Sequence, residues 1–288
     1  MSILNTPNDG LPNIYDLVFN CIDKYGPISE EKLSSKCVPS EICDPQMFDN
    51  ILKRWTQLGV FQKDEEGLWS LVKSRWDCPK RVALNAIFNS SALGDVWSTK
   101  DSYDFIRAAV WLLAQDITKI HFDEKSLQYL ESQQFSMTKD GSPVYLLQNG
   151  VRIRGFKYWA SYFDFFIRSG GEQIDPTGLI RIYLENIFID SKRLSIDLFY
   201  ERLIEVLPIF PGGSLYEKVT DKLNDGSWPK PKASQNELPT SLSRAILRLE
   251  VEGVISTDDV KGDGFKLKLM YSKDLPAATV SHISLESK

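Results

Sequence analysis

Apolar residues recur at helical spacing in the first 77 residues of the chain. The first set occupies positions i, i+3, i+4, i+7, i+8 and i+11, which lie on one face of a helix. Its members are Ile14, Leu17, Val18, Cys21, Ile22 and Tyr25. Gly26 and Pro27 end this helix, because glycine accepts the left-handed C′ conformation and proline cannot continue the helix. Ser29 is an N-cap residue for a second helix, and Asp44-Pro45 begins a third.

The third helix leads into a hairpin pattern. Its apolar face contains Phe48, Ile51, Leu52, Trp55 and Leu58, and Gly59 ends it. Residues 60–62 and 68–72 are short apolar segments on either side of the polar turn at residues 63–67, which predicts a β-hairpin. Three helices followed by a hairpin are typical of a winged helix-turn-helix. The pattern therefore predicts such a domain at residues 1–77.

The last third of the chain repeats this order. A helix that ends at Gly253 carries an apolar face of Leu242, Ala245, Ile246 and Leu249. Aligning Gly253 with Gly59 brings the apolar positions of the two helices into register, which indicates a weak duplication of the fold. Residues 254–255 and 265–269 flank an acidic turn and predict a second hairpin. We therefore expect a second winged-helix-like domain at residues 173–272, with residues 273–288 as a tail.

Residues 78–172 have a helical pattern and form the predicted middle domain. Residues 105–113 have almost no polar face, which is typical of a buried central helix. An aromatic stripe at helical spacing follows, and core packing explains it better than base stacking: Phe156, Trp159, Tyr162, Phe163 and Phe166. Residues 151–157 interleave three cations with apolar residues, as in a phosphate-facing edge or a solvated helix face. The expected fold is mainly α with short β-hairpins: two winged helix-turn-helix domains flanking a helical middle region.

Composition and motifs exclude several classes of protein. Of the 288 residues, 42% are hydrophobic and 25% charged, which is typical of a globular chain and not of a disordered one. The four cysteines form no C-x-x-C pair, His121 and His282 stand far apart, and there is no phosphate-binding glycine loop. We expect no catalytic residues, no metal and no cofactor, and thus a protein that is not an enzyme. Without an apolar membrane-length segment or an export leader, a cytoplasmic protein with no membrane partner is expected.

Charges near the two predicted hairpins indicate what each surface can bind. The net charge of −5 argues against nonspecific coating of nucleic acid. Acidic residues occupy both hairpin tips, where a DNA-binding wing would place cations. In the first tip, Asp64, Glu65 and Glu66 are therefore predicted to bind a protein partner.

Cations lie on the two helices that occupy the recognition position. Lys53 and Arg54 lie on the first of these helices, and Arg244 and Arg248 are one turn apart on the second. With Lys266 and Lys268, which we place on one face of the next strand, they are the candidate nucleic-acid contacts. The alternative for Arg248 is an intrahelical ion pair with Glu252 at i+4.

Two segments resemble a known family. The chain opens with MSILNTPNDGLPN, and residues 52–61 read LKRWTQLGVF. Both resemble the DpdG family, mainly over residues 1–75 with a looser likeness at residues 151–170. That family is a component of the bacterial Dpd gene cluster, which inserts 7-deazaguanine derivatives into DNA and restricts unmodified DNA. The family carries no catalytic motif to transfer, so the resemblance implies a setting in anti-phage defence and not a reaction.

Three functional hypotheses follow from these observations. The first is a non-enzymatic adaptor or DNA-contacting subunit of a DNA modification-restriction complex. Its partners are the other subunits of that defence system, with double-stranded DNA as a further partner. The second is a winged-helix transcriptional regulator that binds a specific DNA site. The third is a metal-dependent nuclease, because Glu30-x-Lys32 resembles the end of a nuclease motif.

Overall fold

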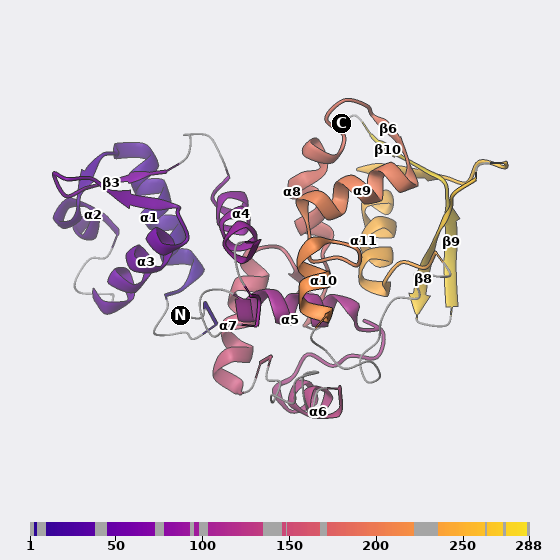
Figure 1. Ribbon diagram of the computed structural model, residues 1–288, viewed down its shortest axis with the longest axis horizontal. Coiled ribbons are helices and arrows are strands. Elements are labelled where there is room, and N and C mark those ends of the chain that lie inside the picture. The colour runs from indigo at the N-terminus through magenta and orange to yellow at the C-terminus, as the bar shows by residue number, and fades with distance from the viewer. Residues whose placement is uncertain are drawn as a thin grey trace. The chain divides into compact units, whose positions relative to one another are not determined.

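The computed structural model describes residues 3–4, 10–37, 45–72, 78–92, 95–97, 103–134, 146–147, 149–167, 172–221, 236–262, 264–272 and 275–286. These residues form a mainly helical protein with small antiparallel sheets, as the sequence predicts (Figure 1). The chain divides into two compact units. Unit 1 comprises residues 1–105 and 149–162, and unit 2 comprises residues 106–148 and 163–288.

Unit 1 begins with the order of elements expected for residues 1–77. Its elements are α1 (Pro12–Tyr25), β1 (Ile28–Ser29), α2 (Glu30–Cys37), α3 (Pro45–Gln57), β2 (Phe61–Lys63), β3 (Leu68–Leu71), α4 (Pro79–Ala92), the first turn of α5 (Tyr103–Ala114) and α7 (Gly150–Tyr162). The hairpin pairs Phe61 with Leu71, and β1 joins its other side by pairing Ile28 with Trp69. The sheet order is therefore β1-β3-β2. The predicted cap Asp44 lies outside the described residues.

An aromatic cluster forms the core of unit 1. The ring of Tyr15 on α1 lies 4.2 Å from that of Trp55 on α3, centroid to centroid, and Trp55 lies 5.4 Å from Trp159 on α7. All three side chains are fully buried. The prediction that the aromatic stripe of α7 packs in a core is thus confirmed for Trp159 and Phe156. The stripe does not extend to Phe166, which lies in a strand of unit 2.

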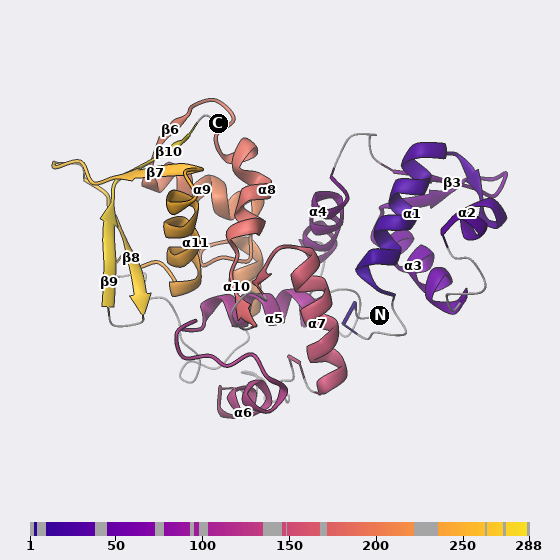
Figure 2. The same cartoon turned by 180° about the vertical axis from the view of Figure 1, so that it is seen from behind.

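Unit 2 contains the remaining helices and three small sheets among its described residues. Its elements are residues 106–114 of α5, α6 (Glu124–Gln134), β4 (Phe166–Ile167), β5 (Gln173–Ile174), α8 (Thr177–Ile187), β6 (Arg193–Ser195), α9 (Ile196–Val206), α10 (Ser214–Thr220), α11 (Thr240–Val251), β7 (Ile255–Asp258), β8 (Leu267–Ser272), β9 (Leu275–Val280) and β10 (His282–Leu285). Figure 2 shows α8, α9 and α11 packed together beside the sheet that contains β7. Residues 105–113, predicted to form a buried central helix, are all less than one-tenth exposed in α5.

The helices α3 and α11 end in the same way. Gly59 and Gly253 both adopt positive φ, at +75° and +66°. The next amide, from Val60 or Val254, donates to the carbonyl five residues earlier, at 2.8 and 2.9 Å. This is the Schellman arrangement, in which a glycine stops the helix and fixes the direction of the following strand. The alignment of the two glycines in the sequence therefore corresponds to a structural equivalence.

The structure contradicts two predictions, the second hairpin formed by residues 254–255 and 265–269 and the tail at residues 273–288. β7 pairs with β10, and β10 also pairs with β6, which gives the sheet order β6-β10-β7. β8 pairs instead with β9. Most of residues 273–288 thus form β9 and β10. β10 lies in the middle of its sheet, and its residue Ile283 is buried. The pattern of alternation identified strands but not their partners, since β pairing is not local.

The predicted middle domain is also distributed differently. The helices α4 and α7 belong to unit 1, whereas α6 and most of α5 belong to unit 2. Residues 78–172 therefore contribute to two cores. The chain leaves unit 1 after residue 105 and returns to it at residue 149.

Replacing Trp55 with alanine should destabilise unit 1 by about 3–5 kcal/mol, because it removes the centre of the aromatic cluster and leaves a cavity. The measurement is the free energy of unfolding from denaturant titration, followed by near-ultraviolet circular dichroism. Tyr129→Ala is the control, since that side chain is 67% exposed and lies outside the cluster. An unchanged transition for Trp55→Ala contradicts the central role of this residue.

Candidate functional site

The helix α11 buries the apolar face predicted for it. Its four predicted core residues are fully buried, and Arg244 on the other side is exposed. Arg248 follows one turn later, but its side chain is only 42% exposed. These two arginines were expected to bind phosphate or base edges together, so the environment of Arg248 decides whether they can.

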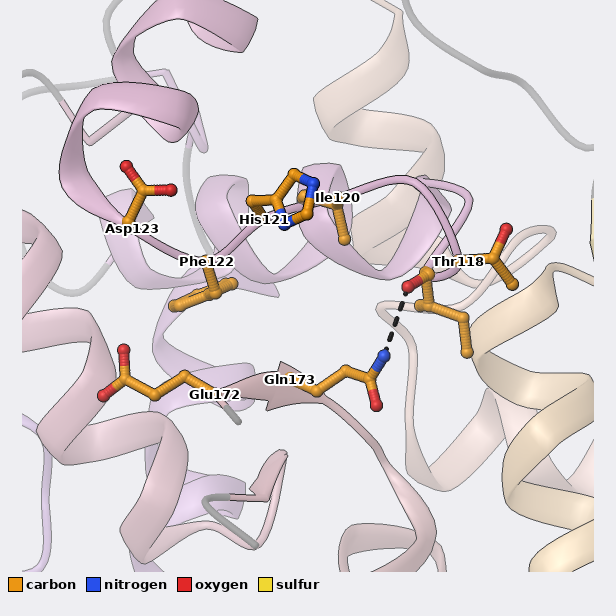
Figure 3. A pocket seen from close by; sticks show the side chains of 8 residues that line it. Thr118, Ile120, His121, Phe122, Asp123, Glu172 and Gln173 are labelled. Atoms are coloured by element: carbon orange, nitrogen blue, oxygen red, sulfur yellow. Dashed lines mark hydrogen bonds between the residues drawn. The ribbon is translucent and has the colours of Figure 1, made fainter. Parts of the chain in front are cut away.

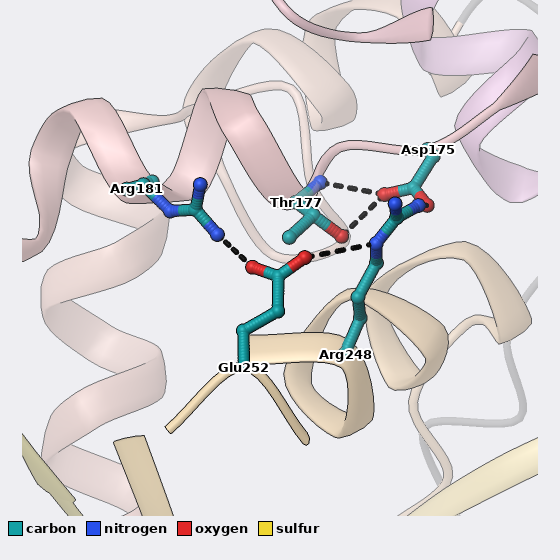
Figure 4. A network of polar contacts seen from close by, with 5 residues as sticks. All are labelled: Asp175, Thr177, Arg181, Arg248 and Glu252. Carbon is teal, nitrogen blue, oxygen red and sulfur yellow. Dashed lines mark hydrogen bonds and ion pairs between the residues drawn. The ribbon is translucent and has the colours of Figure 1, made fainter. Parts of the chain in front are cut away.

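A buried carboxylate holds Arg248. The side chain of Asp175, between β5 and α8, is 1% exposed, and its Oδ2 lies 2.8 Å from Nη1 of Arg248. The other oxygen of Asp175 accepts hydrogen bonds from the backbone N–H of Thr177, at 2.9 Å, and from the Thr177 hydroxyl (Figure 4). The hydrogen bond to Asp175 raises the pKa of Arg248. Arg248 is therefore the counter-ion of a carboxylate that is removed from water.

Glu252 extends this network to the surface. Its carboxylate accepts from Nε of Arg248 at 3.1 Å, which confirms the i+4 ion pair considered for Arg248. Arg181 on α8 binds the other oxygen of Glu252, and Figure 4 shows the carboxylate between the two guanidinium groups. Two of the three guanidinium nitrogens of Arg248 are therefore engaged by acids of the chain, which already neutralise its charge. Arg244 is thus the better placed of the two for nucleic acid.

The lysines that follow α11 do not form the expected pair. Lys266 precedes β8 and binds the carboxylate of Asp259. Lys268 lies within β8 and is exposed. The strand β8 begins at Leu267, so Lys268 belongs to it and Lys266 directly precedes it.

On α3, Lys53 is exposed but Arg54 is not. Arg54 is 3% exposed, which contradicts its predicted place on the surface. The reason is helical spacing: Arg54 lies three residues after the buried Ile51 and four before the buried Leu58. The same spacing that identified the apolar face therefore also indicated that Arg54 lies against it.

The first hairpin tip is exposed and acidic, as predicted. Asp64, Glu65 and Glu66 all lie on the surface between β2 and β3. Asp64 also stabilises the turn, because its Oδ1 accepts the backbone N–H of Leu68 at 2.8 Å. Glu65 and Glu66 are consequently the better candidates for contact with a partner.

The base of this hairpin is tied to α2 by Glu30. Its Oε2 lies 2.8 Å from Nζ of Lys63 and 3.2 Å from Nε1 of Trp69. These contacts, the Lys63 hydrogen bond first, lower the pKa of Glu30. The carboxylate considered as part of a nuclease motif thus holds the hairpin against the helix.

The second acidic turn is used differently. Asp258 binds Arg193 at 3.1 Å across the sheet, and Asp259 binds Lys266. Asp263 lies outside the described residues. The acidic residues described in this turn therefore neutralise cations of the same chain, unlike those of the first hairpin tip.

An open cavity of about 460 Å³ lies between the segment after α5 and the strand β5. It is lined by Ile117, Thr118, Ile120, His121, Phe122, Asp123, Glu172 and Gln173. Figure 3 shows the Asp123 and Glu172 carboxylates toward one end, and toward the other the amide of Gln173, which donates to the Ile117 carbonyl at 3.3 Å. Asp123 also accepts the Ser126 N–H at 3.0 Å and so caps α6. The described residues of the lining include an imidazole and two carboxylates but no thiol or serine hydroxyl.

Among the residues that the structure describes, no three His, Cys, Asp or Glu side chains are grouped so that they could hold a metal ion. None of the helices in the described ranges has the length and apolar character needed to cross a bilayer.

Comparison with known proteins gives one relationship. A family model described as DpdG-like matches residues 1–260, which is most of the chain. No curated protein and no solved structure matches it.

Removing Arg248 should cost more stability than removing Arg244. Arg248→Ala leaves Asp175 buried without its cation, so we expect unit 2 to lose about 2–3 kcal/mol of stability. This loss is smaller than the usual cost of breaking a fully buried pair, because Arg248 is partly exposed. Arg244→Ala should change the stability by less than about 0.5 kcal/mol, as at most exposed positions. Chemical denaturation of the two variants measures the difference. Equal stabilities would show that Asp175 does not depend on Arg248.

The contribution of Glu30 should depend on pH. Since the folded-state pKa of Glu30 is lowered, its stabilisation is present above the unfolded pKa of about 4.3 and is lost as the pH falls through the folded value. At pH 7, Glu30→Gln should cost about 0.2–1 kcal/mol, because the pair with Lys63 is largely exposed.

The measurement is urea unfolding of both proteins from pH 7 to pH 3.5, in which the difference should shrink with acidity. Glu31→Gln is the matched control, because Glu31 is also in the first turn of α2 and experiences the same helix dipole. A difference that stays constant with pH contradicts an ionic role for Glu30.

Proposed function

Since the chain belongs to the DpdG-like family, we propose that it is a non-enzymatic adaptor in the Dpd DNA modification-restriction system. The other components of that system are its partners. The adaptor uses winged helices to dock proteins, with contact to DNA as a secondary role. Winged helices serve both purposes, so the surface chemistry has to decide between them.

The order of strands supports two winged helices in this chain. In unit 1 the order is helix α1, strand β1, helices α2 and α3, and then β2 and β3, with the last strand between the other two. In unit 2 the elements α8, β6, α9, α11, β7 and β10 follow the same order, and β10 again lies between β6 and β7. The helix α10 and the hairpin β8–β9 are then insertions into the second copy. The matching ends of α3 and α11 agree with this assignment.

The observation that carries the adaptor proposal is the engagement of Arg248 by the buried Asp175. It withdraws a central cation of α11 from DNA, and on α3 Arg54 is withdrawn by burial. The exposed Glu65 and Glu66 are instead suited to a basic protein surface and would be repelled by a phosphate backbone.

A DNA-binding regulator is the second candidate, and the exposure of Arg244, Lys53 and Lys268 favours it. If these residues contact phosphates, each neutral replacement should reduce the slope of log affinity against log salt by about one unit. A regulator should also bind a palindromic site with half-sites about 10 bp apart. Tight binding to such a site by the purified chain alone would favour this candidate over the adaptor.

The adaptor proposal is tested by reversing the charge of the hairpin tip. Glu65→Lys with Glu66→Lys keeps Asp64 in its structural role, so the hairpin should still fold. Association with a basic partner should weaken at least tenfold, or by about 1.4 kcal/mol, because two attractive charges become repulsive. Co-purification of the tagged full chain from its native operon, with partner recovery measured across a salt series, gives the readout.

The matched control is Glu201→Lys with Glu205→Lys. These two glutamates are also exposed, but they lie on α9 in unit 2. The control should recover partners as the unmodified chain does. Recovery of the chain alone at every salt concentration counts against an adaptor, and equal recovery by both variants removes the hairpin tip from the interface.

A further inference from the structure

Two helices of unit 1 carry cations without a single acidic residue. α4 contains Lys80 and Arg81, and α7 contains Arg152, Arg154 and Lys157. Over the whole chain, by contrast, there are 39 acidic and 34 basic residues. Both helices are therefore net positive, although the chain as a whole is net negative.

One face of α7 carries a cation followed by two tyrosines. Arg154, Tyr158 and Tyr162 are spaced four residues apart and so lie along one face of the helix. Arg154 is exposed, and Tyr158 is 46% exposed. At the end of the row, the ammonium of Lys80 lies 5.6 Å from the centre of the Tyr162 ring. We call these residues, together with the neighbouring Lys157, the α7 stripe.

Tyr15 and Asp16, two consecutive residues of α1, hold the stripe in place through hydrogen bonds. The hydroxyl of Tyr15 donates to the Pro79 carbonyl at 3.1 Å and anchors the first turn of α4. The carboxylate of Asp16 accepts from the hydroxyl of Tyr162 and anchors the last turn of α7. The two helices accordingly lie next to each other in both views (Figure 1, Figure 2). A surface held in this way loses little entropy when it binds a partner.

Two of the described acids near the stripe, Asp104 and Asp16, have roles of their own. Arg152 pairs with the buried Asp104 at 3.6 Å, so we leave Arg152 out of the stripe. Burial raises the pKa of Asp16, which means that its surroundings disfavour the charged carboxylate, while Tyr162 and Lys80 act in the opposite direction. Arg154 and Lys157 lie nearer the start of α7, and α7 itself contains no acidic residue.

We propose that the α7 stripe binds single-stranded nucleic acid, with phosphates on Arg154, Lys157 and Lys80 and a base stacked on Tyr158. The clustered cations select an anionic partner. The exposed tyrosine between them adds a stacking surface, and single strands offer unpaired bases for that purpose whereas a duplex does not. Because stacking tolerates every base, recognition should show little sequence preference. This site does not depend on the proposed adaptor function or on α11.

The first experiment measures binding of the full chain to a labelled 20-nucleotide single strand by fluorescence anisotropy. Tyr158→Ala should weaken binding about fivefold to 150-fold, which corresponds to the loss of one stacked base. Tyr158→Phe should bind as the unmodified chain does, because the ring is kept. Arg154→Gln should reduce the slope of log affinity against log salt by about 0.7, the value for one phosphate contact on a single strand.

Two control variants test whether binding is specific to the α7 stripe. Tyr129→Ala removes a more exposed tyrosine, on α6 in unit 2, and should leave the affinity unchanged. Arg244→Gln tests whether the strand binds α11 instead, and it should have no effect here. Far-ultraviolet circular dichroism confirms that each variant is folded.

Several results would overturn the proposal. They are equal affinity for a duplex of the same sequence, equally tight binding of polyglutamate, normal binding by Tyr158→Ala, or no binding of the single strand at low salt. The co-purification experiment on Glu65 and Glu66 uses a different surface and different partners. Its failure and the failure of this assay can therefore be told apart.

Discussion

The buried carboxylate of Asp175 is the constraint on which unit 2 depends. A carboxylate that is 1% exposed has lost its hydration and must be compensated by the protein. Thr177 supplies two donors from the start of α8, and Arg248 supplies the charge from α11. The pair therefore joins two helices through one ionic contact. It also decides what α11 can bind, since its second arginine is already committed inside the chain.

The surface chemistry of unit 1 is divided in a different way. The hairpin tip concentrates acidic residues, and the helices α4 and α7 concentrate basic ones. In each region, some residues of the same type are used for structure: Asp64 closes the turn, and Arg152 pairs with Asp104. The remaining exposed charges have opposite sign in the two regions. The two regions are thus separate surfaces of opposite charge that share no residue.

Local signals in the sequence were sufficient for much of the fold. The helices of residues 1–77, their hairpin and the equivalence of Gly59 and Gly253 all follow from spacing and from residues that start or stop helices. The pairing of the strands did not follow from these signals. Residues 282–285 were predicted to be part of a tail, whereas they form β10 between β6 and β7. The candidate site shows the same limit. The contact of Arg248 with Glu252 lies within one helical turn, whereas its contact with Asp175 spans 73 positions and no periodicity reveals it.

The central position of β10 has a consequence for the order in which the protein can form. Both β6 and β7 pair only with β10 in their described sheet, so neither strand has its neighbour until residue 285 has been synthesised. At a translation rate of about 5–20 residues per second, several seconds pass between the synthesis of β6 and that of β10. Unit 1 waits as well, because Trp159 of its aromatic cluster follows more than forty residues of unit 2. While the residues before Trp159 are being synthesised, the nascent chain therefore exposes incomplete cores from both units, and a chaperone has most to protect in that interval. Once α7 has been made, only unit 2 stays incomplete, until β10 emerges.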